Sequence, residues 1–144
     1  CDIKAIALLP NVLLRQQATE AGAAEAILVR DGLAMEGSAS NIFAVVDGVL
    51  VTPPKGPFIL PGITRDLVLE LAHAHGVSCE ERMLKESELA KASELMLSSS
   101  TKELLPITTL NGKPVAGGKP GPVHARLYAL YQDYKREFRA GRAD

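Results

Sequence analysis

Lys4 and Glu36 are the two side chains of this sequence best suited to carbonyl and proton chemistry. Lys4 stands between Ile3 and Ala5 in an apolar stretch. A lysine in a desolvated pocket has a lowered pKa and can form a Schiff base with an aldehyde, whereas a solvated lysine stays protonated. An isolated lysine is more often a surface residue. Lys4 is therefore a candidate nucleophile only in company with other groups.

Glu36 precedes a Gly/Ser turn at residues 37–40, and Asn41 then leads into the apolar run 42–46. This pattern places the carboxylate at the end of a predicted strand, where it could be held rigidly against a bound ring. The common alternative is a solvated loop residue. Glu36 gains a functional interpretation only from its neighbours.

Two further segments could bind a phosphate group. Gly62, Ile63 and Thr64 begin a predicted helix, whose free backbone N–H groups and dipole favour an anion. The hydroxyl cluster at residues 98–101, which contains Ser99 and Ser100, follows a short predicted strand and could contact the same phosphate. A simple helix cap and a polar turn are the commoner explanations of these two segments.

Together, these residues provide the groups that pyridoxal 5′-phosphate requires. The cofactor needs a Schiff-base lysine, a site for its phosphate, and an acid that keeps its ring nitrogen protonated. The sequence contains neither a Gly-x-Gly-x-x-Gly pattern nor a P-loop, so a dinucleotide or a P-loop nucleotide is not indicated.

The elements that must position these residues follow from hydrophobic periodicity and turn signals. Helices are predicted at residues 10–22, 63–76, 85–92 and 123–138. Strands are predicted at residues 26–29, 33–36, 42–46, 49–52, 77–83, 95–97, 107–110 and 113–115. Three pairs of these strands form hairpins, which excludes a purely parallel sheet and predicts an α/β (α+β) unit.

Composition limits the class of protein. The 144 residues, 47% of them hydrophobic, suffice for one domain with a core. The net charge of −1 gives no field that would attract nucleic acid or an anionic membrane. No apolar run is long enough to span a bilayer, and the N-terminus lacks a signal-peptide pattern, so we expect a cytoplasmic protein.

No metal is predicted, because the cysteines and histidines lack ligand spacing. Cys1 and Cys79 are far apart, His73 and His75 fall on different faces of a predicted helix, and His124 stands alone. The chain begins with Cys-Asp-Ile-Lys rather than with Met, which suggests a piece of a longer protein.

Five motifs in order resemble the class IV (fold type IV) pyridoxal-phosphate aminotransferases, with D-amino-acid transaminases as the closest match. They are Cys-Asp-Ile-Lys with Leu-Leu-Pro-Asn-Val-Leu, Glu-Ala-Ile-Leu-Val-Arg-Asp-Gly, Glu-Gly-Ser-Ala-Ser-Asn-Ile-Phe, Leu-Pro-Gly-Ile-Thr-Arg-Asp and Ser-Ser-Ser-Thr-Lys-Glu-Leu-Leu-Pro-Ile. The resemblance spans nearly the whole chain.

The resemblance implies a role for individual residues. Lys4 matches the Schiff-base lysine that also moves a proton, and Glu36 matches the acid facing the pyridine nitrogen. The remaining matches are Leu60 near the ring, and Ile63, Thr64, Ser99 and Ser100 at the phosphate. Ala5, Ala7 and Ala39 stand where Ser, Asn and Ser are frequent, so the substrate class is less defined than the chemistry.

The resemblance also implies the architecture and the activity. Residues 1–144 would form the single cofactor-binding C-terminal domain, with a mixed sheet or pseudo-barrel, hairpins and three to four helices. The complete enzyme, with an N-terminal domain, would be a homodimer that transfers an amino group between a D-amino acid and a 2-oxo acid. The alternatives are a branched-chain aminotransferase, an aminodeoxychorismate lyase, a catalytically inactive fragment, or a small module that binds some other phosphate.

Overall fold

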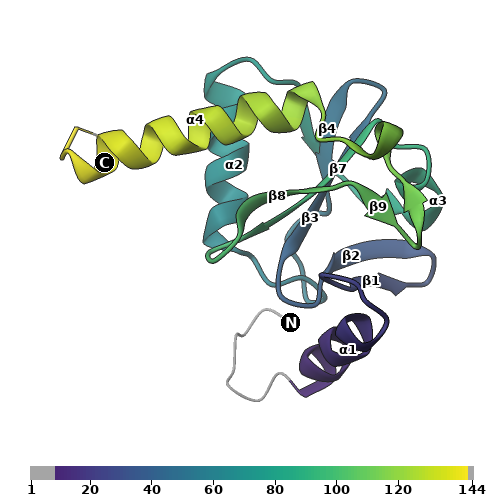
Figure 1. The fold of residues 1–144 in the computed structure, drawn as a ribbon. Helices are drawn as coiled ribbons and strands as arrows, with labels where there is room; N and C mark the ends of the chain where they lie inside the picture. The colour runs from purple at the N-terminus through teal and green to yellow at the C-terminus, as the bar shows by residue number, and fades with distance from the viewer. Residues whose placement is uncertain (1–8, 143–144) are drawn as a thin grey trace.

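The computed structural model describes residues 9–142 (Figure 1), so the predictions for Lys4, Ala5 and Ala7 lie outside the described part. Its helices are α1 (Leu9–Glu20), α2 (Ile63–Ala74), α3 (Glu86–Leu89), a short 3-10 helix η1 (Ala116–Gly118) and α4 (Pro122–Arg139). The predicted α+β class, with three to four helices and a mixed sheet, is confirmed.

The largest sheet has five strands in the order β5-β4-β3-β7-β8. Its strands are β3 (Asn41–Val46), β4 (Val49–Thr52), β5 (Cys79–Glu81), β7 (Glu94–Ser99) and β8 (Glu103–Ile107). β4 and β5 are parallel, and the other neighbours are antiparallel. Because β3 pairs with β7 from Asn41 opposite Ser98, the predicted acid turn and the hydroxyl cluster meet at one end of this sheet.

Two smaller sheets complete the strand structure. The first has the order β1-β2-β6 and consists of β1 (Ile27–Arg30), β2 (Leu33–Gly37) and β6 (Leu84–Lys85). The second pairs β9 (Thr109–Leu110) with β10 (Lys113–Pro114). The two-residue turns Asp31-Gly32, Asp47-Gly48 and Asn111-Gly112 have both residues at positive φ, as a type I′ hairpin turn requires.

The five-stranded sheet has apolar side chains on both faces. Neighbouring side chains of a strand point to opposite faces of the sheet. Phe43 of β3 and Met96 of β7 therefore lie in one apolar cluster, and Ile42 and Leu97 lie in the other. Helices α2 and α4 cover the face that carries Phe43 and Met96 (Figure 1). The C-terminal part of α4 extends beyond the sheet edge.

Several predicted bounds differ from the structure. Helix α3 is shorter than the predicted helix at 85–92, and β5 is shorter than the predicted strand at 77–83. The sequence patterns do not predict strand β8, and Ile107, which they place in the third hairpin, belongs to it. Pro106 lies inside β8 and argues against a strand in sequence, but β8 is at the edge of the sheet, where a missing N–H is tolerated.

Helix α1 differs from its prediction in packing. The sequence predicts an amphipathic helix with a buried face, yet none of its residues is buried against the rest of residues 9–142. Leu9, Val12, Leu13 and Leu14 are exposed. The segment is helical nonetheless because most of its residues have a high helix propensity. Pro10 lies in the first turn, where proline is tolerated.

Within residues 9–142, no helix combines the length and the apolar character needed to cross a membrane. The predicted cytoplasmic location stays a prediction.

Candidate functional site

Glu36 lies at the C-terminal end of β2 and is only 4% exposed. Its Oε2 accepts a hydrogen bond from the backbone N–H of Leu60 at 2.8 Å. Burial raises the pKa of this carboxyl above its usual 4.5, and hydrogen bonds from Leu60 and Asn11 partly offset that effect. Glu36 is therefore held in place and desolvated, in contrast to the solvated loop residue that was the common alternative.

A second carboxylate, Glu25, holds the turn that follows Glu36. It accepts hydrogen bonds from the Ser38 hydroxyl and, at 3.1 Å, from the backbone N–H of Ala39. The ammonium group of Lys102 lies 3.7 Å from Glu25 Oε2. Since Lys102 belongs to the turn after the hydroxyl cluster, Glu25 connects the two turns at this end of the sheet.

The backbone of Leu60, which is bonded to the Glu36 carboxylate, leads directly into the start of α2 at Ile63. Gly62 is the N-cap of α2. Because glycine has no side chain, it does not cap the first backbone N–H groups of the helix. Thr64 is buried, with 8% exposure, whereas the side chain of Ile63 is exposed. The predicted anion site at this helix start stays a prediction.

Asn41 joins these two parts of the site, although the sequence did not single it out. Its Nδ2 donates a hydrogen bond to the Leu60 carbonyl at 2.8 Å. Asn41 is 6% exposed and lies opposite Ser98 across the β3–β7 ladder. The signal that could have found it is an amide residue directly before a buried apolar strand, following an acidic turn.

The hydroxyl cluster divides into three environments. The Ser98 hydroxyl is buried and has no hydrogen-bond partner among the described residues. The Ser99 hydroxyl accepts the Lys102 N–H at 3.1 Å, and Ser100 is exposed. The Ser99 hydroxyl therefore stabilises the turn that follows it. Its predicted contact with a phosphate stays a prediction. Ser98 belongs to the hydroxyl cluster at residues 98–101, and its buried hydroxyl is left without a partner within the described chain.

Arg65, which was also not predicted from the sequence, stabilises the segment between β4 and α2 that contains Leu60. Its guanidinium is fully buried and donates to the Pro53 carbonyl at 2.8 Å and to the Glu81 carboxylate. Asp66 pairs with both Arg65 and Lys55, at 3.1 and 2.7 Å. The β4 end of the segment between β4 and α2 is thereby fixed to the first turn of α2.

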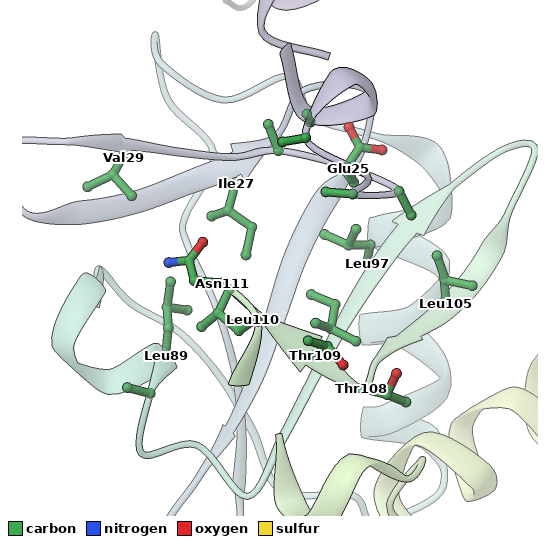
Figure 2. Close-up of a pocket in the computed structure, with 18 of the residues that line it drawn as sticks. Glu25, Ile27, Val29, Leu89, Leu97, Leu105, Thr108, Thr109, Leu110 and Asn111 are labelled. Atoms are coloured by element: carbon green, nitrogen blue, oxygen red, sulfur yellow. The ribbon is translucent and has the colours of Figure 1, made fainter. Parts of the chain in front are cut away.

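A large cavity lies close to this site but is distinct from it. It has a volume of about 1140 Å³ and lies between β1, β8, β9 and α3. Figure 2 shows Ile27 of β1 on one side of it, with Leu97 and Leu110 on the other. Glu25 lines it, but none of the site residues predicted within the described chain does. Among the predicted residues that the structure describes, Glu36 contacts Leu60, which lies three residues before Ile63.

Comparison with known proteins gives a consistent result. The family model for class IV amino-transferases matches residues 1–110. A D-alanine aminotransferase of Bacillus licheniformis is 41% identical over 133 residues, which cover 92% of this chain and 47% of that protein. A D-alanine aminotransferase of Listeria monocytogenes is 40% identical over 131 residues, covering 91% and 45%. The chain thus spans about half the length of the curated relatives it matches.

Solved structures of similar fold are branched-chain aminotransferases. One from Escherichia coli superimposes with a TM-score of 0.84 at 35% identity, over 88% of this chain and 43% of that one. One from the archaeon Thermoproteus uzoniensis, with norvaline, has a TM-score of 0.83 at 32% identity, over 94% and 43%. A third, complexed with N-(5′-phosphopyridoxyl)-L-glutamate, has a TM-score of 0.84 at 31% identity, over 88% and 43%.

Proposed function

The chain belongs to the class IV aminotransferase family, and from this premise we propose that it forms the pyridoxal 5′-phosphate-binding part of an aminotransferase. The observation that carries the proposal is the junction at Leu60. A buried carboxylate and an uncapped helix start are joined there through a single residue. One planar ligand with a basic nitrogen at one end and a phosphate at the other could contact both.

The residues around this junction fit such a ligand. The Gly62 N-cap leaves N–H groups of α2 for an anion, and the buried Ser98 hydroxyl at the adjoining strand end lacks a partner within residues 9–142. We assign the phosphate to the backbone of Ile63 and Thr64, the Thr64 hydroxyl, and the hydroxyls of Ser99 and Ser100. Leu60 would pack near the ring.

Glu36 would hold a proton on the ring nitrogen. A buried carboxylate with a raised pKa becomes fully ionised when a cation is placed beside it, because the two charges stabilise each other in a site of low dielectric constant. When bound, the cofactor supplies an electron-accepting ring. The task of Glu36 is therefore to keep that ring positively charged at neutral pH.

Lys4 would link covalently to the aldehyde of the cofactor and, once released, would move a proton at the substrate α-carbon. This role comes from the resemblance of its motif, since Lys4 lies outside the described residues. A lysine freed near a positively charged ring has a lowered pKa and can act as a base at neutral pH.

We propose a D-amino acid and a 2-oxo acid as the substrates. The support is that relatives about 40% identical to this chain are named D-alanine aminotransferases. A branched-chain aminotransferase is the second candidate, because solved structures of that activity superimpose closely. Ala39, in the turn held by Glu25, is the difference from the D-amino-acid pattern that lies in the described part.

We further propose that the complete active site uses groups outside these 144 residues and that the working enzyme is a homodimer. The chain spans about half of its relatives, and no residue in it is assigned to grip the substrate carboxylate. The exposed apolar side chains of α1 support the presence of a covering surface. The isolated chain should accordingly have little or no transaminase activity.

The test is an assay of a polypeptide that joins this chain to a segment matching the rest of its relatives. D-Alanine, L-leucine and aminodeoxychorismate are offered as separate substrates. We expect turnover of D-alanine with a 2-oxo acid, loss of cofactor absorbance in Lys4→Ala, and retained cofactor with most of the rate lost in Glu36→Gln. Normal turnover by Glu36→Gln would contradict the role given to Glu36.

A further inference from the structure

The peptide groups of Leu60 are held on both sides by side chains from two different strands. Its N–H donates to Glu36 Oε2 of β2, and its carbonyl accepts from Asn41 Nδ2 of β3, each at 2.8 Å. Glu36 and Asn41 are almost fully buried. Since Leu60 lies three residues before the first residue of α2, Ile63, any movement of its backbone moves both the carboxylate contact and the helix start.

Gly62 gives a second, independent sign of the same contact. Its φ of −71° and ψ of 137° are open to any residue, so backbone conformation does not require glycine here. A Cβ at this position would instead lie 2.3 Å from Asn41 Oδ1 and 3.5 Å from its Cγ. The Asn41 carboxamide therefore occupies the space where a side chain would be. Asn41 thus contacts the segment before α2 at two residues, at Leu60 through Nδ2 and at Gly62 through Oδ1.

We infer that Asn41 is a positioning residue that holds the Glu36 carboxylate and the first turn of α2 in a fixed relation to each other. This inference rests on the proposed function, because the fixed relation matters when one ligand must contact both. Asn41 would touch neither the ring nor the phosphate itself.

The chemistry of the carboxamide suits this role. It presents a donor to the Leu60 carbonyl and a compact planar oxygen to Gly62. Aspartate at this position could not donate to a carbonyl when ionised, and it would add a negative charge near Glu36. Alanine would leave the part-buried Leu60 carbonyl without its side-chain partner. The hydroxyl of Ser98, opposite Asn41 in the ladder, does not bond the Leu60 carbonyl, because it has no hydrogen-bond partner within the described chain.

Thr52 provides a matched control. Its hydroxyl donates to the Ile42 carbonyl of the same sheet at 2.7 Å, and the residue is as deeply buried as Asn41. Thr52→Val removes one buried hydrogen bond from side chain to backbone while keeping the shape. Asn41→Ala and Thr52→Val should therefore both lower stability, and only the first should disturb Leu60.

The first measurement follows the Leu60 amide by NMR in the 144-residue chain while pH is varied, without cofactor. In the wild type and in Thr52→Val this amide should titrate with the Glu36 carboxyl to which it is bonded. In Asn41→Ala the amide should lose that response, and the Glu36 pKa should rise further because one hydrogen bond that favours its ionised form is lost. An unchanged Leu60 titration in Asn41→Ala would overturn the inference.

Gly62→Ala tests the same contact without truncating Asn41. In the wild type the new methyl group must displace the Asn41 carboxamide, so the Leu60 amide should again lose its titration. In the Asn41→Ala background the colliding oxygen is absent, and the same substitution should have little additional effect on stability or on the NMR titration. Additive effects of the two substitutions would contradict the inference, because contacting residues are expected to couple.

The last measurement links the contact to ligand binding, with inorganic phosphate and pyridoxal 5′-phosphate as probes. Asn41→Ala should weaken pyridoxal 5′-phosphate by about tenfold relative to Thr52→Val, with a smaller effect on inorganic phosphate, which needs only the helix start. Equal affinities in the two variants would overturn the positioning role. If the wild-type chain binds neither probe, the proposed cofactor site in this chain fails, and the NMR titrations still decide whether Asn41 holds Leu60.

Discussion

Glu36 shows how burial gives a single carboxyl a measurable effect on stability. Because its pKa is raised in the folded state above the usual 4.5, the folded protein binds its proton more tightly than the unfolded chain does. Its contribution to stability is thus fully present below pH 4.5 and is lost as pH rises through the folded-state pKa. Above that range the ionised, buried carboxylate destabilises the fold, as long as no positively charged ligand is bound beside it.

Glu36→Gln removes this titration and keeps the side-chain oxygen that accepts the Leu60 N–H. We expect the variant to be more stable than the wild type at neutral pH. Below pH 4.5 the free energies of unfolding of the two proteins should change with pH in the same way. Urea unfolding at several pH values measures this difference. Thr52→Val, which removes a buried side-chain hydrogen bond and no titratable group, is the control, and its difference from the wild type should not depend on pH. A constant difference between Glu36→Gln and wild type across pH would contradict the prediction.

Among the elements, α4 depends on a side chain from a distant strand. Glu94 of β7 is buried and accepts the N–H groups of Val123 and His124 at 2.9 and 2.8 Å, which satisfies two of the free donors at the start of the helix. Gly121 is required beside it, because a Cβ there would lie within 2.5 Å of the Glu94 carboxyl group. This contact joins α4 to the five-stranded sheet.

Glu94→Ala should therefore lower the free energy of unfolding by about 2 kcal/mol, since it removes a charged helix cap and leaves a cavity. Chemical denaturation followed by circular dichroism measures the loss. Glu137→Ala, at an exposed position of the same helix, should change stability by less than about 0.5 kcal/mol. Similar values for the two variants would show that the Glu94 contact does not stabilise α4.

For the whole molecule, the core does not include α1. The two apolar clusters are formed by the sheets, α2, α3 and α4 with their connections, and no residue of α1 is buried. The link of α1 to the site is Asn11, whose side chain hydrogen-bonds Glu36 and, at 3.3 Å, donates to the Ser38 carbonyl. The exposed Leu13 and the buried Leu127 thus offer a direct comparison of the two kinds of helix.

Leu13→Lys should change the unfolding free energy of this chain by less than about 0.5 kcal/mol. Leu127→Ala, which truncates a side chain that is 1% exposed in the cluster under α4, should cost about 3 kcal/mol. Urea denaturation of both variants provides the comparison. A large loss in Leu13→Lys would mean that α1 packs on the core of the isolated chain.

Features that depend on neighbouring residues could be predicted before the fold was known. Asp31-Gly32, Asp47-Gly48 and Asn111-Gly112 form hairpin turns because both central residues accept positive φ, and the alternation in β3 sorts its side chains to two faces. The family motifs are likewise contiguous, so Glu36, Ile63 and Thr64 could be selected before any fold was known.

Contacts between distant segments become visible only in the folded chain. Leu60 meets Asn41 and Glu36 from 19 and 24 positions away, and Glu94 meets His124 from 30. Such pairs depend on the order of strands and on how α2 and α4 pack, neither of which is encoded in local periodicity. The sequence therefore places Asn41 before a buried strand but gives it no role. Burial of Glu36, and the exposure of the apolar face of α1, also arise only when the surfaces that surround each element are known.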